Sequence, residues 1–161
     1  MHKPFYKVET YRGGKSVGYL IKRIFTQMTP HVEAVFAGSE LTFSQWVVLM
    51  CLRDGIADTA AAIARHMNHD TGAVTRLIDQ LETRGLIKRQ RSTADRRVVH
   101  LELLPTGRAL AKALTPGIVD FWNRMLSDFT TAECEALLGL LGRLNQRLEA
   151  EEVVNGEGAA A

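Results

Sequence analysis

The sequence predicts a mainly α-helical chain with a single small β-hairpin, and three observations support this fold class. Leu and Ala are abundant, while aromatic residues make up only 7% of the chain, a composition that favours helices. Apolar residues recur at helical spacing over most of the length. In residues 99–103 apolar and polar residues alternate instead, which is typical of a strand.

The overall composition limits the possible classes of protein. A chain of 161 residues that is 46% hydrophobic is long enough for one domain with its own core. No segment has the roughly 18 to 20 apolar residues of a membrane span, and the N-terminus lacks the apolar core of a signal peptide. We therefore expect a cytoplasmic protein that does not cross a membrane. Its two cysteines, Cys51 and Cys134, lie in apolar helical contexts and are expected to be buried, inert thiols.

The first half of the chain is expected to form four helices. The first runs from Ser16 to about residue 37, and Pro30 should bend it. The second is capped by Thr42 or Ser44 and ends at Gly55. The third is short and capped by Asp58 or Thr59, and the fourth covers "TGAVTRLIDQLETRG". The last two are joined by the turn "NHD", which makes them a helix-turn-helix arrangement.

The second helix of that pair has two distinct faces. Val74, Leu77, Ile78 and Leu81 recur at i, i+3, i+4 and i+7 and predict a buried stripe. The opposite face carries Gly72, Thr75, Arg76 and Asp79. Its side chains are small near the start of the helix, and Arg76 is its one long hydrogen-bond donor. Such a helix suits the major groove of DNA, although an ordinary amphipathic surface helix has the same pattern.

A basic hairpin follows directly. Residues 84–97 carry six basic residues and one acid, although the net charge of the whole chain is only +2. Clustered Lys and Arg attract a phosphate backbone, and a solvated charged hairpin is the alternative on charge alone. A helix-turn-helix followed by a hairpin is a winged helix. The arginines at its tip, in "STADRR", would reach an adjacent minor groove.

The last part of the chain predicts two long helices, the first containing Pro116, which should bend it. In the second, which runs from about Thr131 to Glu149, apolar residues recur at steps of 3, 4, 3 and 4, at Cys134, Leu137, Leu141, Leu144 and Leu148. This is a coiled-coil-like seam, and a winged-helix core does not need it. We expect residues 16–37 and 105–150 to form the dimerisation region of a homodimer, residues 42–104 to form the DNA-binding lobe, and residues 151–161 to be a disordered tail. The predicted fold is thus a single domain, a winged helix-turn-helix flanked by long dimerisation helices.

From Ser16 to Leu148 the sequence resembles the MarR family of bacterial regulators, most specifically in "LTFSQWVVL", "VTRLIDQLETRGLIKR" and "DRRVVHLELLPTG". The resemblance implies a winged-helix dimer that binds DNA and responds to small molecules. It places the minor-groove arginine of the wing at Arg97, with Asp95 orienting the tip. Gly72 departs from the serine often found at its position in the family. The implied effectors are aromatic carboxylates or phenols, and the implied mode of action is repression that the effector relieves.

These considerations give three sets of candidate residues. The DNA-binding set is Thr71, Gly72, Thr75, Arg76, Lys88, Arg89, Arg91, Asp95, Arg96 and Arg97. The ligand-binding set is Arg12, Lys15, Ser16, Tyr19 and Trp46, and the dimerisation set is Leu137, Leu141, Leu144 and Leu148.

The expected partner of a two-fold dimer is double-stranded DNA with a roughly palindromic operator. The alternative function is a winged-helix module for protein–protein contacts that binds no operator. We expect no cofactor and no metal, because His66, His69, Asp70 and His100 lack the spacing of a zinc site. An enzyme is not expected, because the sequence has neither a phosphate-binding loop nor a nucleophile elbow.

Overall fold

The computed structural model describes residues 4–158 and places side chains up to residue 151. The chain divides into two compact units, one ending at Val119 and the other beginning at Asp120, whereas the sequence predicted one domain with a helical region from residue 105. None of the helices in the described part of the chain combines the length and the apolar character needed to cross a bilayer.

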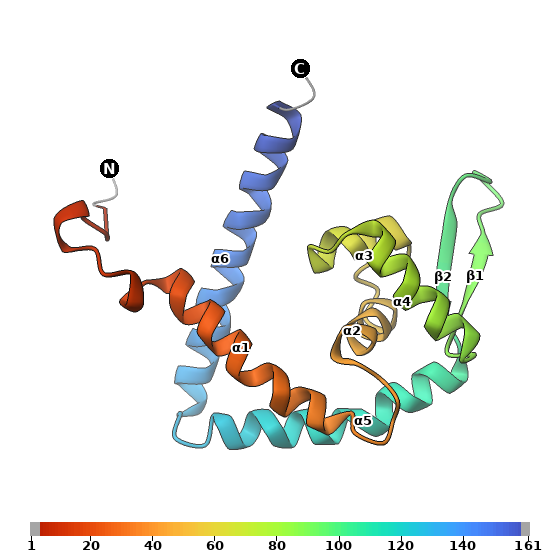
Figure 1. The fold of residues 1–161 in the computed structure, drawn as a ribbon, viewed down its shortest axis with the longest axis horizontal. Coiled ribbons are helices and arrows are strands. Elements are labelled where there is room, and N and C mark those ends of the chain that lie inside the picture. The colour runs from red at the N-terminus through yellow and green to blue at the C-terminus, as the bar shows by residue number, and fades with distance from the viewer. Residues whose placement is uncertain (1–3, 159–161) are drawn as a thin grey trace. The chain divides into compact units, whose positions relative to one another are not determined.

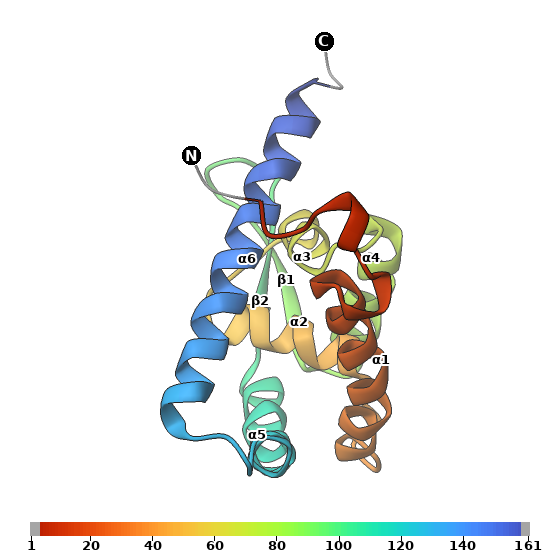
Figure 2. The same ribbon diagram turned by 90° about the vertical axis from the view of Figure 1, so that its left-hand side faces the viewer.

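The elements follow the predicted order (Figures 1 and 2). They are two short 3-10 helices, Val8–Thr10 and Gly13–Lys15, then α1 (Val17–Val35), α2 (Phe43–Arg53), α3 (Ala60–Met67), α4 (Thr71–Thr83), β1 (Ile87–Arg91), β2 (Val99–Leu103), α5 (Pro105–Met125) and α6 (Thr131–Gly158). The mainly helical fold with one antiparallel hairpin is thus confirmed. The boundary between the two units falls inside α5.

Side-chain oxygens fix the starts of the first four α-helices. The capping residues are Ser16 for α1, Thr42 for α2, Thr59 for α3 and Asp70 for α4. Each accepts a hydrogen bond from a backbone N–H of the first turn that has no partner within the helix. Thr42 forms a full capping box, because Gln45 Oε1 accepts from its backbone N–H at 3.0 Å. The cap of α2 is therefore Thr42 and not Ser44, and the cap of α3 is Thr59 and not Asp58.

The turn between α3 and α4 depends on a left-handed residue. Asn68 has a φ of +49°, a conformation that Asn tolerates better than most residues because its short side chain can bond the local backbone. Three residues later α4 begins, and it ends before Gly85, whose φ is +66°. The sequence thereby determines both ends of the predicted groove helix.

The core of the first unit lies between α2, α3, α4, the hairpin and the start of α5. Its fully buried side chains include Val48, Leu49, Ile63, Val74, Ile78, Leu81 and Ile87, with Leu101, Leu103 and Ala111 beside them. The predicted stripe of α4 is buried, with Leu77 half-buried. The register pairs Ile87 with Leu103 and Arg91 with Val99. One face of the hairpin therefore closes the core, and the segment 92–98 extends beyond it.

The apolar stripe of α1 is only partly used. Val32 is buried, but Val17, Leu20, Ile21 and Ile24 are between 41% and 56% exposed. The C-terminal part of α1 therefore contributes to the core of this unit, while its N-terminal part presents apolar side chains to solvent.

In the second unit, α6 begins with another reciprocal cap and exposes most of its leucines. Glu133 accepts from both the N–H and the hydroxyl of Thr130 at 2.8 Å, and these bonds lower the pKa of Glu133. Leu137, Leu138, Leu140, Leu141 and Leu148 are all exposed, and Leu144 is half-buried.

The prediction of a disordered tail from residue 151 was wrong for residues 151–158. There α6 continues to Gly158, and the segment contains no proline that would end the helix. Residues 159–161 of the predicted tail lie outside the described residues.

Candidate nucleic-acid interface

The outward surface of α4 is formed by the residues that the sequence singled out. Thr71, Gly72 and Arg76 are exposed and Thr75 is half-buried, while Val74 and Ile78 face the core. The Thr75 hydroxyl donates to the Thr71 carbonyl at 2.8 Å, so it remains available as an acceptor. A Cβ at position 72 would lie 3.0 Å from Asp70 Oδ1, the oxygen that caps the helix. Gly72 thus keeps the first turn of α4 small without disturbing its cap.

The tip of the hairpin, residues 92–98, has an ordered hydrogen-bond pattern. Ser92 N–H donates to the Val98 carbonyl and Val98 N–H donates to the Asp95 carbonyl, each at 2.9 Å. Asp95 Oδ1 accepts from the Arg97 N–H at 2.9 Å. Asp95 therefore folds the backbone beside Arg97, as expected for a residue that orients the tip.

On α4 and the hairpin, four arginines carry positive charge that no carboxylate neutralises. Among the side chains described, Arg76, Arg91, Arg96 and Arg97 are exposed and form no ion pair. Three of them lie on or beside the wing tip, and the fourth lies on α4. Unpaired guanidinium groups on two adjacent elements are suited to bind an anionic surface.

The two basic residues at the base of the hairpin differ from these four. Lys88 forms an ion pair with Glu102 at 2.8 Å, and Arg89 binds Asp79 at 2.6 Å and also Glu82. Burial by itself would lower the pKa of Arg89, but the hydrogen bonds that its guanidinium group donates to Asp79 and Glu82 outweigh it and raise the pKa. Lys88 and Arg89 therefore differ from the four unpaired arginines, because neighbouring carboxylates neutralise the charge of both.

The hairpin is also tied to the segment before α3. Asp58 accepts from the backbone N–H of Leu101 at 2.7 Å through its carbonyl, and its carboxylate lies 2.8 Å from Nδ1 of His100. His66 and His69 are exposed, and no group of three metal-binding side chains occurs among the described residues.

The predicted ligand residues do not come together within one chain. Trp46 packs in an aromatic cluster, with ring centroids 5.8 Å from Phe36 and 6.4 Å from Phe43. Phe36 follows the C-terminal end of α1, whereas Tyr19 and Ser16 lie at its start. At 1.5 Å per residue, the 17 positions from Tyr19 to Phe36 span about 25 Å. Within one chain the length of α1 therefore separates Trp46 from the other members of the predicted set, and the grouping stays a prediction.

Within the remaining set, the hydrogen bonds of Ser16 are already used. Its hydroxyl donates to the Gly13 carbonyl at 2.8 Å and accepts from Tyr19 N–H. Arg12, Lys15 and Tyr19 are exposed. The Trp46 indole N–H is buried without a hydrogen-bond partner among the described residues.

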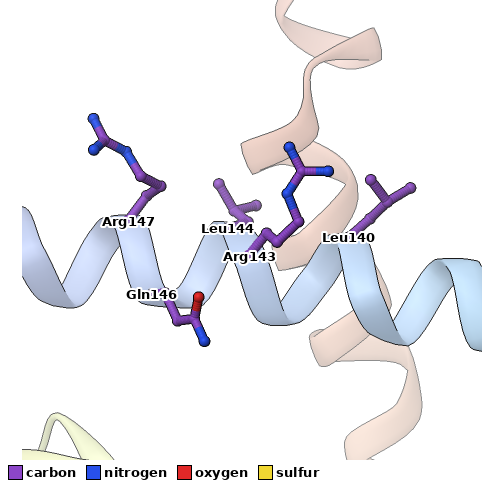
Figure 3. A pocket seen from close by; sticks show the side chains of 5 residues that line it. All are labelled: Leu140, Arg143, Leu144, Gln146 and Arg147. Atoms are coloured by element: carbon purple, nitrogen blue, oxygen red, sulfur yellow. The ribbon is translucent and has the colours of Figure 1, made fainter.

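An open hollow of about 440 Å³ lies along α6 (Figure 3). Leu140, Arg143, Leu144 and Arg147 rise from one side of the helix, and Gln146 leaves from the other side. The hollow includes Leu144 from the predicted seam and none of the predicted ligand residues.

The cysteines differ from each other. Cys51 is 1% exposed, and burial together with the negative charge of Asp54 raises the pKa of its thiol. A raised pKa leaves little reactive thiolate, as expected for an inert core cysteine. Cys134 on α6 is only half-buried, so the expectation of burial was wrong there.

Comparison with known proteins identifies the family. The sequence model of the MarR family matches residues 41–99. An HTH-type transcriptional repressor of Mycobacterium tuberculosis is 31% identical over 128 residues, covering 80% of this chain and 92% of the relative. The chain belongs to the MarR family. The HTH-type transcriptional repressor YetL of Bacillus subtilis is 27% identical over 158 residues, 91% of this chain and 95% of the relative. The protein is accordingly a DNA-binding transcriptional repressor of the MarR type.

Solved structures agree with this family. BpsR of Bordetella bronchiseptica is 29% identical, with a TM-score of 0.73 over 84% of this chain and 96% of that chain. Its structure concerns the regulation of BpsR DNA binding by 6-hydroxynicotinic acid. A mutant MarR of E. coli in complex with operator DNA, 23% identical, has a TM-score of 0.69 over 80% of this chain and 92% of that chain. The second likeness concerns the fold alone, and both confirm the winged-helix architecture.

Sequence reasoning missed the acidic residues that organise the interface. Asp79 and Glu82 lie three positions apart on α4, which places them on one face, and the basic strand β1 follows within a few residues. The spacing of these acids relative to the first basic residues of the strand was a signal that could have identified the ion pairs.

Proposed function

We propose that this MarR-type repressor binds a roughly palindromic operator through α4 in the major groove and through the wing tip in the minor groove. The observation that carries the proposal is the set of four exposed arginines without ion pairs on α4 and the neighbouring hairpin. The buried stripe of α4 holds that helix against the core, so its outward face is a rigid surface. Such a regulator would act in the cytoplasm.

The two elements have different roles in this proposal. Arg76, with Thr71, Gly72 and Thr75 beside it, reads base edges, where a guanidinium group can bind guanine through two hydrogen bonds. Arg97 enters the minor groove, whose narrow negative channel attracts arginine, and Asp95 orients it. Arg91 and Arg96 bind phosphates and position the lobe without reading the sequence.

The proposed assembly is a homodimer built from α1, α5 and α6. Its support is the exposure of Leu137, Leu141 and Leu148, together with the N-terminal stripe of α1, in the single chain. Exposed apolar side chains that follow one face of a helix mark a contact surface. A two-fold axis would set two α4 helices about one helical turn of DNA apart.

The proposed effector is a small aromatic acid or phenol that releases the repressor from DNA. The regulation of BpsR by 6-hydroxynicotinic acid supports this chemical class. Arg12 and Lys15 offer positive charge for the carboxylate, and Tyr19 offers a hydroxyl beside them. The effector can act only by binding the DNA-incompetent arrangement more tightly, so DNA must weaken effector binding by the same factor, typically about 5- to 150-fold.

A mobility-shift assay with the protein's own upstream DNA tests this function. We expect binding in competition with random DNA, and release by at least one member of a panel of benzoates, hydroxynicotinates and phenols. Calorimetry of the same ligand with the wild type and with Arg12→Ala tests the proposed effector position. Binding of a ligand without loss of DNA affinity would contradict the switch. Absence of operator binding would instead favour a protein–protein module.

A further inference from the structure

Arg89 connects the hairpin to α4 through three hydrogen bonds. Its backbone N–H donates to Glu82 Oε1 at 2.9 Å, and its guanidinium group donates to Glu82 Oε2 and, at 2.6 Å, to Asp79 Oδ1. Glu82 therefore holds both the backbone and the side chain of Arg89. The two acids are three positions apart on α4, so one side chain reaches both.

The charges around Arg89 differ from those around its neighbour on the same strand. Two carboxylates surround one guanidinium group at Arg89, and the local sum is −1. Arg91, two residues further along β1, is exposed and has no ion pair among the described side chains. A phosphate that binds Arg89 would lie close to two carboxylates and be repelled by them, whereas no carboxylate is paired with Arg91 among the described side chains.

We propose that Arg89 is a positioning residue that fixes the wing relative to α4 and does not itself bind DNA. Asp79 and Glu82 are its anchors on the groove helix. A wing tip that enters the minor groove while α4 occupies the major groove must be held at one angle to α4, and this contact joins the two elements directly. The inference rests on the proposed DNA contacts of α4 and Arg97.

The sign of the change in affinity separates this role from simple electrostatics. Asp79→Asn and Glu82→Gln keep the shapes of the side chains and each removes one negative charge close to the proposed DNA surface. If the acids acted only through charge, these changes would strengthen binding, because less repulsion would oppose the phosphates. If the acids hold the wing, the same changes weaken binding although the protein becomes more positive.

The experiment compares operator affinity at fixed salt for the wild type, the Asp79→Asn/Glu82→Gln double variant and Glu102→Gln. Glu102→Gln is the matched control, because it removes a carboxylate and an ion pair within the hairpin but leaves the contact with α4 intact. We expect the double variant to bind roughly 5- to 30-fold more weakly and the control to bind equally or more tightly. Ion pairs as exposed as these contribute little to folding, so thermal unfolding should change little.

A second comparison uses Arg97→Ala as the background. If the wing is already misplaced, the double variant should lose little more affinity when Arg97 is also removed. Likewise, the slope of operator affinity against salt concentration should be the same for Arg97→Ala and for Arg97→Ala with Arg89→Gln. If Arg89→Gln reduces that slope by about one phosphate contact, Arg89 binds DNA and the inference is wrong. Tighter operator binding by the Asp79→Asn/Glu82→Gln double variant would also contradict it.

The operator affinity of Arg97→Ala alone distinguishes a failure of the proposed DNA contact of the wing from a failure of the positioning role of Arg89. If Arg97→Ala leaves affinity unchanged, the proposed role of the wing fails, and the positioning role of Arg89 fails with it. If Arg97→Ala weakens binding but the double variant binds more tightly, only the positioning role fails.

Discussion

Helices α4 and α6 carry similar apolar periodicity but use it differently. On α4, Val74, Ile78 and Leu81 are fully buried within the unit that contains them. On α6, Leu137 is 39%, Leu141 45% and Leu148 58% exposed. Burying one such side chain is worth about 1.5–3 kcal/mol. The single chain obtains this stabilisation from α4 and largely lacks it from α6.

This difference assigns a separate task to each region. The first unit has a core that closes around α4, so the outward face of α4 can evolve contacts with another molecule without losing its support. The leucines of α6 have no comparable core among the described residues, and a second copy of the chain would bury them. In this account the first unit recognises DNA, and α6 sets the spacing between two such units.

The largest expected effect is on the assembly, from Leu141→Lys. Leu141 is 45% exposed in the single chain, so losing its burial on both sides of a two-fold interface costs about 1.5–3 kcal/mol of association free energy. The introduced charges, which have no partner, add to this loss. Sedimentation velocity should show the variant as a monomer at micromolar concentration. Gln146→Lys adds the same charge about 140° further around α6, five positions from Leu141, on the side opposite Leu144 (Figure 3), and should remain dimeric. Dissociation of both variants would indicate a general effect of charge.

A core substitution in α4 should have the next largest effect, on folding. Ile78 is fully buried, so Ile78→Ala should lower the free energy of unfolding by about 2–5 kcal/mol. Chemical denaturation measures this change. His66→Ala, at an exposed position of α3, should stay within about 0.5 kcal/mol of the wild type. Equal stability of Ile78→Ala and the wild type would mean that α4 is not held by its core.

At the wing tip the effect should fall on DNA binding and leave folding unchanged. Arg97→Ala should weaken operator binding by about 1–3 kcal/mol, because the exposed guanidinium group has no ion pair among the described residues. Fluorescence anisotropy at matched salt measures the loss. Lys112→Ala, exposed on α5, removes the same charge away from the proposed surface and should bind like the wild type. Equal losses in both variants would remove the wing from the mechanism.

The smallest expected effect distinguishes sequence-specific base contacts from nonspecific electrostatic attraction to the DNA phosphates. Arg76→Ala should reduce the preference for operator over random DNA, because Arg76 projects from the groove face. Lys88→Ala should weaken both complexes equally and by less, because Glu102 already neutralises Lys88. Competition titrations with random DNA measure the ratio. An unchanged ratio for Arg76→Ala would mean that Arg76 contacts phosphates only.

Local patterns in the sequence predicted the fold well. Each cap was narrowed to two residues, Thr42 or Ser44 and Asp58 or Thr59. Val74 and Ile78 were recognisable as a buried stripe, and Leu101 and Leu103 as a strand, because each depends on spacing within a few residues. The family also followed from motifs that span most of the chain.

Contacts between elements were predicted less well. Free and paired arginines look alike in a sequence, so the pairing of Arg89 with Asp79 and Glu82 was missed. Trp46 was grouped with Tyr19 as a possible wall of the ligand site, and only the length of α1 shows that the two residues lie apart within one chain. The extension of α6 to Gly158 was missed because a run of small and acidic residues is compatible with either a helix or a tail.

The most direct test of the account is the mass of the wild-type protein in solution without DNA. Sedimentation equilibrium at micromolar concentration should give twice the 17.9 kDa of the chain, with no monomer on dilution to the detection limit. The apolar side chains of α1 and α6 would then be covered by a second copy. A stable, folded monomer at micromolar concentration would contradict the account, because those side chains would remain in water and nothing would set the distance between two α4 helices.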